Sequence, residues 1–142
     1  MTDYKKQGKR NKINGAIFER RVRADLESKG WIVSKWQNNV ELPKGISNQL
    51  IEARNYAKCV QAKPGRFRMM QTGFPDFIAF ELQVELDLFE IIFIECKTNG
   101  RLDKIEKEKA KWYLDNHYCS KLYIASKVKE KNRIKIKYEE FK

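Results

Sequence analysis

The sequence predicts an α/β fold in which helices flank a mixed central sheet. Two observations support this: apolar residues recur at helical spacing in two segments, and runs rich in β-branched and aromatic residues lie before, between and after them. At 142 residues the chain is long enough for one domain with a substantial core. The order of helical and extended segments favours a sheet covered by helices.

The first helix is predicted to begin at Asn14, which can cap it, and to run to about Lys29, with Gly30 ending it. Glu19 lies about 100° round this helix from Phe18, at the edge of the buried face, where it could look into a cleft. Residues 1–12 are polar and basic and are predicted to be a flexible tail. The apolar face comprises Phe18, Val22 and Leu26, with Ile17 beside them.

The remaining segments supply the strands and a second helix. Residues 37–72, with Pro43 and Gly45, are interpreted as an insert in the single domain, residues 1–142. No internal repeat or second domain is indicated. The predicted strands cover residues 31–36, 75–81, 89–97, 121–126 and 133–138, and the predicted helix covers residues 103–117.

The charge predicts a polyanionic partner. Thirty Lys and Arg residues oppose nineteen Asp and Glu residues, a formal net charge of +11. Nucleic acid is the favoured partner, and a basic surface without a single partner is the alternative. The excess clusters near the N-terminus and again from Lys127 to Lys137. The candidate DNA-binding residues are Lys5, Lys6, Lys9, Arg10, Lys12, Arg20, Arg21, Arg66 and Arg68, the last two flanking Phe67.

The sequence predicts no membrane partner and a cytoplasmic protein. No run of about 18 apolar residues exists, as a transmembrane helix would require, and no apolar core follows the basic N-terminus, as in a signal peptide. Three cysteines without metal-type spacing, Cys59, Cys96 and Cys119, suit reduced thiols. A nucleoid-associated protein, or a viral protein in a host cytoplasm, fits these features.

Charged residues interrupt two apolar strands. Asp76 stands at the start of one, and Glu95 and Lys97 lie two apart on the next, so their side chains share a face. A desolvated carboxylate is costly unless it is paired or holds a metal. Carboxylate oxygens suit Mg²⁺, for which Mn²⁺ can substitute. Lys97 could orient a water molecule or stabilise charge that grows on a phosphate.

The residues P-D at 75–76 and E-C-K at 95–97 resemble the core motif of the PD-(D/E)xK nuclease superfamily. The resemblance spans roughly residues 14–36 and 73–126. It implies a restriction-endonuclease-like fold, with Asp76, Glu95 and the backbone carbonyl of Cys96 as metal ligands and Lys97 as a catalytic residue. The alternative is that Asp76 caps a turn and that Glu95 and Lys97 form a surface pair.

The segment GAIFERRVRADLESKGW is similar to the first helix of the archaeal Holliday-junction resolvases, in which a Gly begins the helix and a Glu joins the metal site. This similarity maps onto Gly15 and Glu19. GFPDF is also similar to the virus-type replication-repair nucleases, and Lys109 stands where both groups carry a Gln.

Together these resemblances imply a Mg²⁺-dependent endonuclease and homodimer acting in DNA recombination and repair by resolving four-way junctions. The alternatives are a nuclease of the same fold that cuts flaps, single strands or specific duplex sites, and a DNA-binding relative without catalysis.

Overall fold

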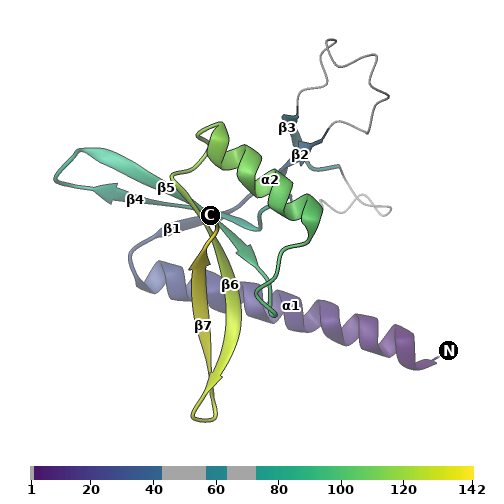
Figure 1. Ribbon diagram of the computed structural model, residues 1–142. Helices are drawn as coiled ribbons and strands as arrows, with labels where there is room; N and C mark the ends of the chain where they lie inside the picture. The colour runs from purple at the N-terminus through teal and green to yellow at the C-terminus, as the bar shows by residue number, and fades with distance from the viewer. Residues whose placement is uncertain (1, 43–56, 64–72) are drawn as a thin grey trace, which may run out of the picture.

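A computed structural model describes residues 2–42, 57–63 and 73–142 (Figure 1). Five strands form a mixed sheet in the order β1-β4-β5-β6-β7, and β2 pairs with β3 in a separate two-stranded sheet. The predicted α/β class is therefore confirmed. The elements are α1 (Thr2–Ser28), β1 (Ile32–Lys35), β2 (Asn38–Glu41), β3 (Lys58–Gln61), β4 (Phe77–Gln83), β5 (Leu88–Cys96), α2 (Lys104–Asp115), β6 (Lys121–Glu130) and β7 (Arg133–Glu140).

The connections follow from the strand directions. β4 and β5 form an antiparallel hairpin, as do β6 and β7, and β1 runs antiparallel to β4. β5 and β6 are parallel, so the chain must cross over between them, and α2 makes that crossing. The crossover places the end of β5 and the start of α2 at the same edge of the sheet, where the charged motif lies.

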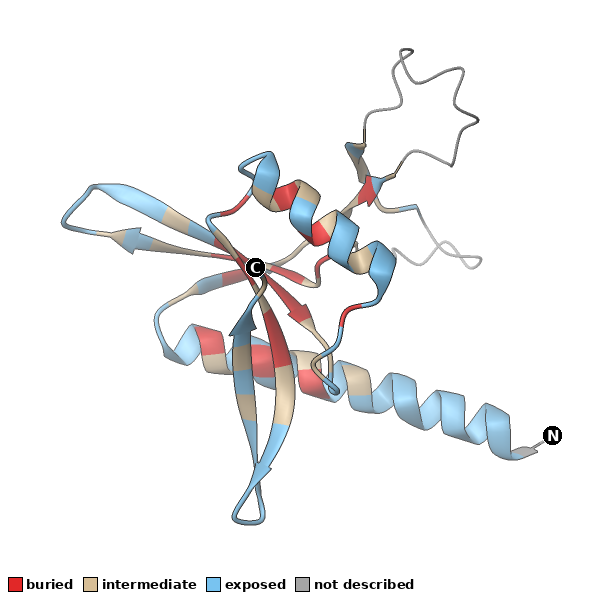
Figure 2. Cartoon of the chain, in the orientation of Figure 1, coloured by how far each residue is buried: buried red, intermediate tan, exposed pale blue. Residues whose placement is uncertain are grey.

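The two helices cover opposite faces of the sheet (Figures 1 and 2). Strand alternation sends Phe77 and Ile94 towards α1, while Phe93 points towards α2. The buried side chains on the α1 side are Phe18, Val22, Leu26, Val33, Phe77, Ala79, Ile92, Ile94 and Ala125. Those on the α2 side are Val40, Phe74, Phe93, Leu102, Ala110, Tyr113, Cys119, Leu122 and Ile124.

The start of α1 corrects a prediction. The helix begins at Thr2 rather than at Asn14, so residues 2–12, predicted as a flexible tail, are helical, and Gly15 lies inside the helix instead of beginning it. Lys, Arg and Gln are strong helix formers, and they outweigh the penalty of roughly 1 kcal/mol for each interior glycine. The other end agrees with the prediction: Gly30 has φ +97°, which favours glycine.

The segment that leads into β4 passes very close to β2. A Cβ on Gly73 would lie 1.8 Å from the carbonyl oxygen of Asn38, so only glycine fits there. The Gly73 N–H donates to the Trp36 carbonyl at 3.1 Å, and the Trp36 N–H donates to the Asp76 carbonyl at 3.1 Å. These contacts fix residues 73–76 against the β1–β2 connection and so set the position of Asp76.

The predicted insert, residues 37–72, contains β2 and β3, which pair antiparallel from Asn38 opposite Gln61 to Glu41 opposite Lys58. Arg66, Phe67 and Arg68, predicted to contact DNA, lie outside the described residues.

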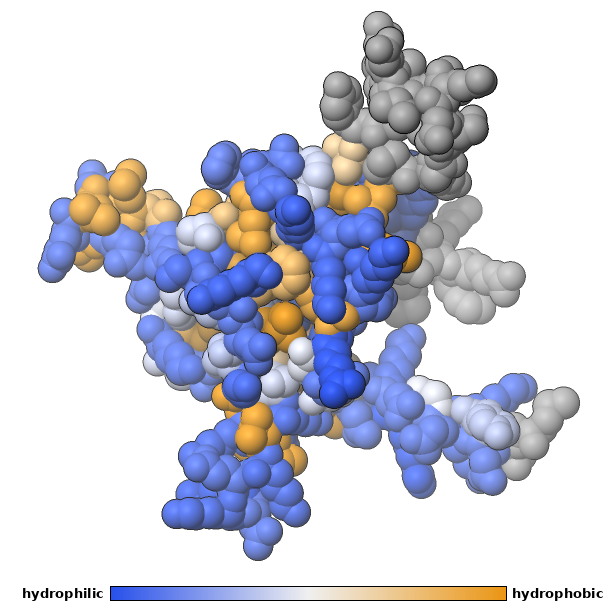
Figure 3. Space-filling view, viewed as in Figure 1, coloured by the Kyte–Doolittle hydropathy of each residue, from blue (hydrophilic) through white to orange (hydrophobic). Residues whose placement is uncertain are grey.

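The β4–β5 hairpin extends past its neighbours, because β1 pairs with β4 only as far as Phe80 and β6 pairs with β5 only from Ile92. Its outer end exposes apolar side chains, visible as the orange patch at the end of the hairpin in Figure 3. The exposed residues are Leu82, Val84, Leu86, Leu88 and Phe89. In the part of the chain that the structure describes, neither helix is long and apolar enough to span a membrane.

Candidate active site

Asp76 and Glu95 are held together by the backbone of their own strands. Asp76 immediately precedes β4, and Glu95 is the penultimate residue of β5. The Asp76 N–H donates to Glu95 Oε2 at 3.1 Å, and the Cys96 N–H donates to Asp76 Oδ2 at 2.8 Å. The structure therefore brings together the two carboxylates that the strand pattern predicted, and each carboxylate is oriented by a backbone donor next to the other.

Burial makes this pair electrostatically unfavourable without a cation. Glu95 is only 6% exposed. Desolvation and then the charge of Asp76 raise the pKa of Glu95 to about 8. Desolvation and the charge of Glu19 also raise the pKa of Asp76, against the hydrogen bond from Cys96. A divalent cation between the two acids would offset both effects, and one or two carboxylates plus waters are the usual ligands of Mg²⁺.

Lys97 joins the pair to α2. Its Nζ lies 3.2 Å from Glu95 Oε1 and also donates a hydrogen bond to Glu106 Oε1. Glu106 is itself fixed, because its other oxygen accepts from the Asp103 N–H at 2.9 Å in a capping box at the start of α2. Desolvation opposes the charged ammonium, but the hydrogen bond with Glu106 and the charge of Glu95 outweigh it and raise the pKa of Lys97.

Glu19 lies close enough to Asp76 for its charge to raise the pKa of Asp76, and it pairs with Lys35 Nζ. Lys35 also sits over the ring of Phe77, 4.7 Å from its centroid. Over the described ranges, no three His, Cys, Asp or Glu side chains are grouped closely enough to hold a metal ion by themselves. Asp76 and Glu95 thus form the carboxylate centre, and direct ligation by Glu19 stays a prediction.

A groove of about 570 Å³ opens beside this centre. One wall comes from the middle of α1, another from the end of β5 and the turn after it, and a third from β6. Lys97 and Glu19 both line it, so the predicted location of Glu19 at a cleft is confirmed. The lining residues are Asn11, Asn14, Gly15, Phe18, Glu19, Cys96, Lys97, Thr98, Asn99 and Lys127.

The side chain and the backbone carbonyl of Cys96 have to be distinguished. Its side chain packs against the buried cluster on the α1 side, the face opposite Glu95, and burial raises the pKa of its thiol far above the ordinary value. The Cys96 thiol therefore stays protonated and is not a reactive nucleophile. Ligation of a metal by its backbone carbonyl stays a prediction.

The predicted DNA-binding residues within the described chain are all on α1 and are exposed: Lys5, Lys6, Lys9, Arg10, Lys12, Arg20 and Arg21.

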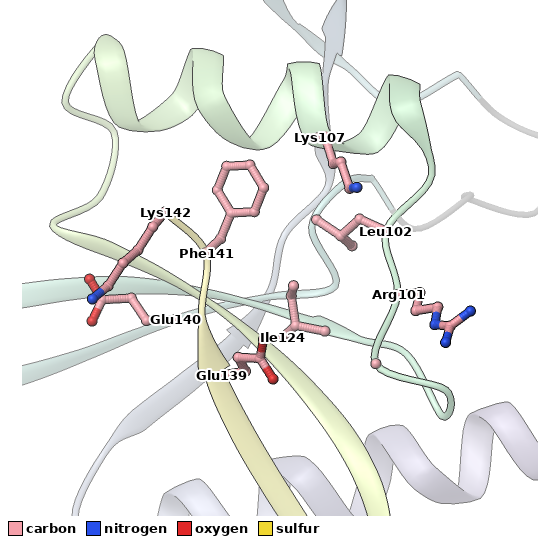
Figure 4. A pocket seen from close by; sticks show the side chains of 9 residues that line it. Arg101, Leu102, Lys107, Ile124, Glu139, Glu140, Phe141 and Lys142 are labelled. Carbon is pink, nitrogen blue, oxygen red and sulfur yellow. The ribbon is translucent and has the colours of Figure 1, made fainter.

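A second cavity, of about 530 Å³, lies between the turn after β5, α2 and the C-terminus (Figure 4). Phe141 points towards α2 there, with Leu102 and Ile124 nearby. The charged residues at its rim carry both signs, including Arg101, Lys107, Glu139 and Glu140. None of the candidate catalytic side chains lines it.

Sequence reasoning missed Glu106 and Lys35. The segment of residues 106–111, EKEKAK, reads as a solvated face, yet Glu106 is half-buried and holds Lys97. The D-x-x-E spacing of Asp103 and Glu106 is a capping-box pattern, which was the available signal. Nothing in the sequence pairs Lys35 with Glu19, because the contact joins a helix to a strand across the sheet face.

Comparisons of this chain with protein-family models, with curated proteins and with solved structures find no match. The function of this protein is therefore inferred from the geometry of the carboxylate centre and from the charge of the surface.

Proposed function

We propose that this protein is a Mg²⁺-dependent DNA endonuclease that hydrolyses phosphodiester bonds, with Mn²⁺ able to replace Mg²⁺. The observation that supports it best is the carboxylate pair of half-buried Asp76 and buried Glu95. The pair lies beside Lys97, which lines an open groove in a strongly basic protein. Buried acids that lower stability unless a cation joins them are typical of a functional site.

Asp76 and Glu95 would hold the metal, with the Cys96 carbonyl and Glu19 as the further ligands that the motif implies. Bound Mg²⁺ makes a water molecule more acidic and neutralises charge on the phosphate. The two backbone donors at Asp76 and Cys96 keep the carboxylates in place as substrate enters. Preorganisation of this kind lowers the cost of reaching the transition state.

Lys97 is the residue that faces the groove with a positive charge next to the carboxylates. During hydrolysis a water oxygen bonds to phosphorus while the bond to the leaving oxygen breaks, and negative charge grows on the phosphate oxygens. The Lys97 ammonium can donate a hydrogen bond to one of them. Glu106 holds that ammonium in place from the side of α2.

The finer proposal is that the substrate is a four-way junction and that the active form is a homodimer. The sequence similarity of residues 15–31 to the first helix of the resolvases supports it, although Gly15 lies inside α1 and does not begin it. One domain of this size offers one carboxylate centre, so two symmetric incisions need two copies. Cutting of flaps, single strands or specific duplex sites by the same centre is the alternative.

The test uses the purified full-length protein with Mg²⁺ on four end-labelled substrates: a fixed junction, a flap, a duplex and a single strand. Asp76→Asn is the matched control, because it keeps the shape of the side chain and removes its charge. Cleavage of at least one substrate by the wild type alone is expected. Equal activity of wild type and Asp76→Asn, or cleavage that persists in EDTA, would remove the metal-nuclease proposal.

The positions of the cuts and the mass of the protein in solution distinguish junction resolution from the alternative substrates. Paired symmetric nicks in the junction, together with a dimeric mass by light scattering, support junction resolution. A monomer, or cuts confined to a flap or one duplex sequence, moves the protein to the alternative substrate class. DNA binding without cleavage of any substrate identifies a binding relative instead.

A further inference from the structure

Most of the net positive charge is carried by two arms. The helical arm is the N-terminal half of α1, residues 2–14, and the hairpin arm is the outer part of β6–β7, residues 127–137. Together they contain eleven of the thirty Lys and Arg residues but only two of the nineteen Asp and Glu residues. Both arms are largely exposed and project from the body of the molecule with open space between them (Figures 2 and 3).

The groove of the candidate active site lies where the two arms leave the body. Asn11 and Asn14 of the helical arm line it, and so does Lys127 at the base of the hairpin arm. Lys127 Nζ lies 5.2 Å from the centroid of the Phe18 ring on α1, so the bases of the arms are in contact. A polyanion that followed both arms would therefore cross the groove beside Lys97.

The two faces of the hairpin arm differ. Lys127 lies opposite Ile136 and Lys129 opposite Ile134, so these four side chains share the face directed towards α1. Lys135 and Lys137 are on the other face, where they pair with Glu130 and Glu139. Among the described residues, Lys127 and Lys129 have no acidic partner within ion-pair distance. Of these four lysines, the two on the side of the groove are therefore the ones free to meet phosphates. On the outer face of the described hairpin, Arg133 near the tip has no ion pair either.

The helical arm is also two-sided. At about 100° per residue, Asn11 and Gly15 lie on the same side as Phe18, which faces the groove. Arg10 lies about 80° from the direction of Phe18, and Lys6 and Lys12 lie about 120° from it on either side, whereas Lys9 and Arg20 point away. Gly8 and Gly15 are on the groove side, and a Cβ at either would meet nothing within 4 Å. No neighbour in the described chain requires glycine there, and the bare backbone allows an outside group to approach closely.

We propose that duplex DNA lies between the two arms, and the choice of DNA rests on the proposed function. Lys127 and Lys129 contact its phosphates on one side, and Arg10 and Lys12, which flank the groove side of the helical arm, contact them on the other. Two separated rows of cations suit the two backbones of a duplex. Tyr4 is the one aromatic residue in the arms, so they do not carry the series of stacking side chains that is typical of single-strand binding.

The test compares two double variants of the full-length protein that remove equal charge from opposite faces of the same hairpin. Lys127→Gln/Lys129→Gln changes the groove face, and Lys135→Gln/Lys137→Gln changes the outer face. Binding of a labelled DNA duplex is measured by fluorescence anisotropy in EDTA at several salt concentrations, so that the result does not depend on cleavage. Circular dichroism confirms that each variant is folded.

The groove-face variant is expected to raise Kd roughly tenfold to a hundredfold near 0.1 M salt and to reduce the salt slope by about two, as the loss of two phosphate contacts requires. The outer-face variant is expected to change Kd less than about threefold. Because Lys127 also contacts Phe18, the single variants Lys129→Gln and Lys135→Gln repeat the comparison at exposed positions away from the core.

Equal losses for the two faces, or no binding of duplex by the wild type, would overturn the two-arm interface. Tighter binding of duplex RNA or of a single strand than of duplex DNA would overturn the choice of partner. A face-specific loss in a protein that cleaves nothing would remove the proposed nuclease while leaving the interface intact. If the wild type cleaves DNA but the groove-face and outer-face variants lose equal affinity, the nuclease proposal stands and the two-arm interface is excluded.

Discussion

The backbone N–H of Asp76 donates a hydrogen bond to the side-chain carboxylate of Glu95 at 3.1 Å. The donor belongs to one candidate ligand and the acceptor to the other, so neither acid can move without disturbing its neighbour. The arrangement holds two like charges together in a buried place, where they lower stability unless a proton or a cation is present.

Without metal, the free energy of unfolding is expected to fall as pH rises. The pKa of Glu95 is raised from 4.5 to about 8 in the folded protein. Below pH 4.5 the Glu95 carboxyl is protonated in both the folded and the unfolded protein, and stability is greatest. Between pH 4.5 and about 8 the carboxyl loses its proton in the unfolded protein but keeps it in the folded protein, so the free energy of unfolding declines with rising pH. At about 1.4 kcal/mol per pKa unit, the decline is a few kcal/mol.

Thermal unfolding in EDTA between about pH 5 and about pH 9 measures this, with Glu95→Gln as the control that should remove most of the slope. Adding Mg²⁺ is expected to raise Tm more at the alkaline end, because the ion then competes with fewer protons. A wild-type profile parallel to that of Glu95→Gln would contradict the assignment.

Lys97→Ala is expected to lower kcat by about 10²–10³ while leaving DNA affinity nearly unchanged. The substitution removes the ammonium beside the carboxylates but only one of thirty positive side chains. A loss of about 10²–10³ in kcat is typical for one transition-state donor. Lys111→Ala, at an exposed position of α2, is the charge-matched control for both cleavage rate and anisotropy. An unchanged kcat in the Lys97 variant would exclude its catalytic role.

Glu106 is expected to act as a positioning residue for Lys97. Glu106→Gln keeps an oxygen that can accept from the Asp103 N–H but removes the charge that holds the ammonium. We expect kcat to fall roughly tenfold with KM unchanged, since about 1.4 kcal/mol of orientation is lost from the transition state. Steady-state kinetics should separate this from Glu108→Gln, an exposed neighbour on the same helix. Identical kcat values for the two variants would mean that Glu106 only caps α2.

Two glycine substitutions are expected to have opposite effects on stability. Gly73→Ala would place a Cβ 1.8 Å from the Asn38 carbonyl oxygen, so the backbone must shift at a cost of about 1–3 kcal/mol. Gly15→Ala meets open space inside α1 and should stabilise the helix by roughly 0.5–1 kcal/mol. Urea unfolding measures both. Stabilisation by Gly73→Ala would show that the approach to β2 does not hold residues 73–76.

Local pattern was sufficient for the five strands of the main sheet and for the carboxylate pair, whereas β2 and β3, inside the predicted insert, were missed. The apolar runs around Asp76 and Glu95 predicted neighbouring strands, and strand alternation placed Glu95 and Lys97 on one face. The boundaries of β4, β5, α2 and β7 lie within two residues of the predicted ranges, whereas β6 continues to Glu130, past its predicted end at residue 126. The start of α1 was wrong, because Asn14 and Gly15 resemble a helix start in isolation, whereas the strong helix formers before them continue the helix to Thr2.

The sequence by itself determined the α/β class, the two strands at whose ends Asp76 and Glu95 lie, and the excess of positive charge. These depend on residue type and on periods of two and 3.6 residues. Only the tertiary structure decided that Glu106 holds Lys97, that Glu19 pairs with Lys35, and which face of the β6–β7 hairpin looks towards α1. These contacts join separate elements, and their geometry is set by how the helices pack on the sheet, which no local pattern encodes.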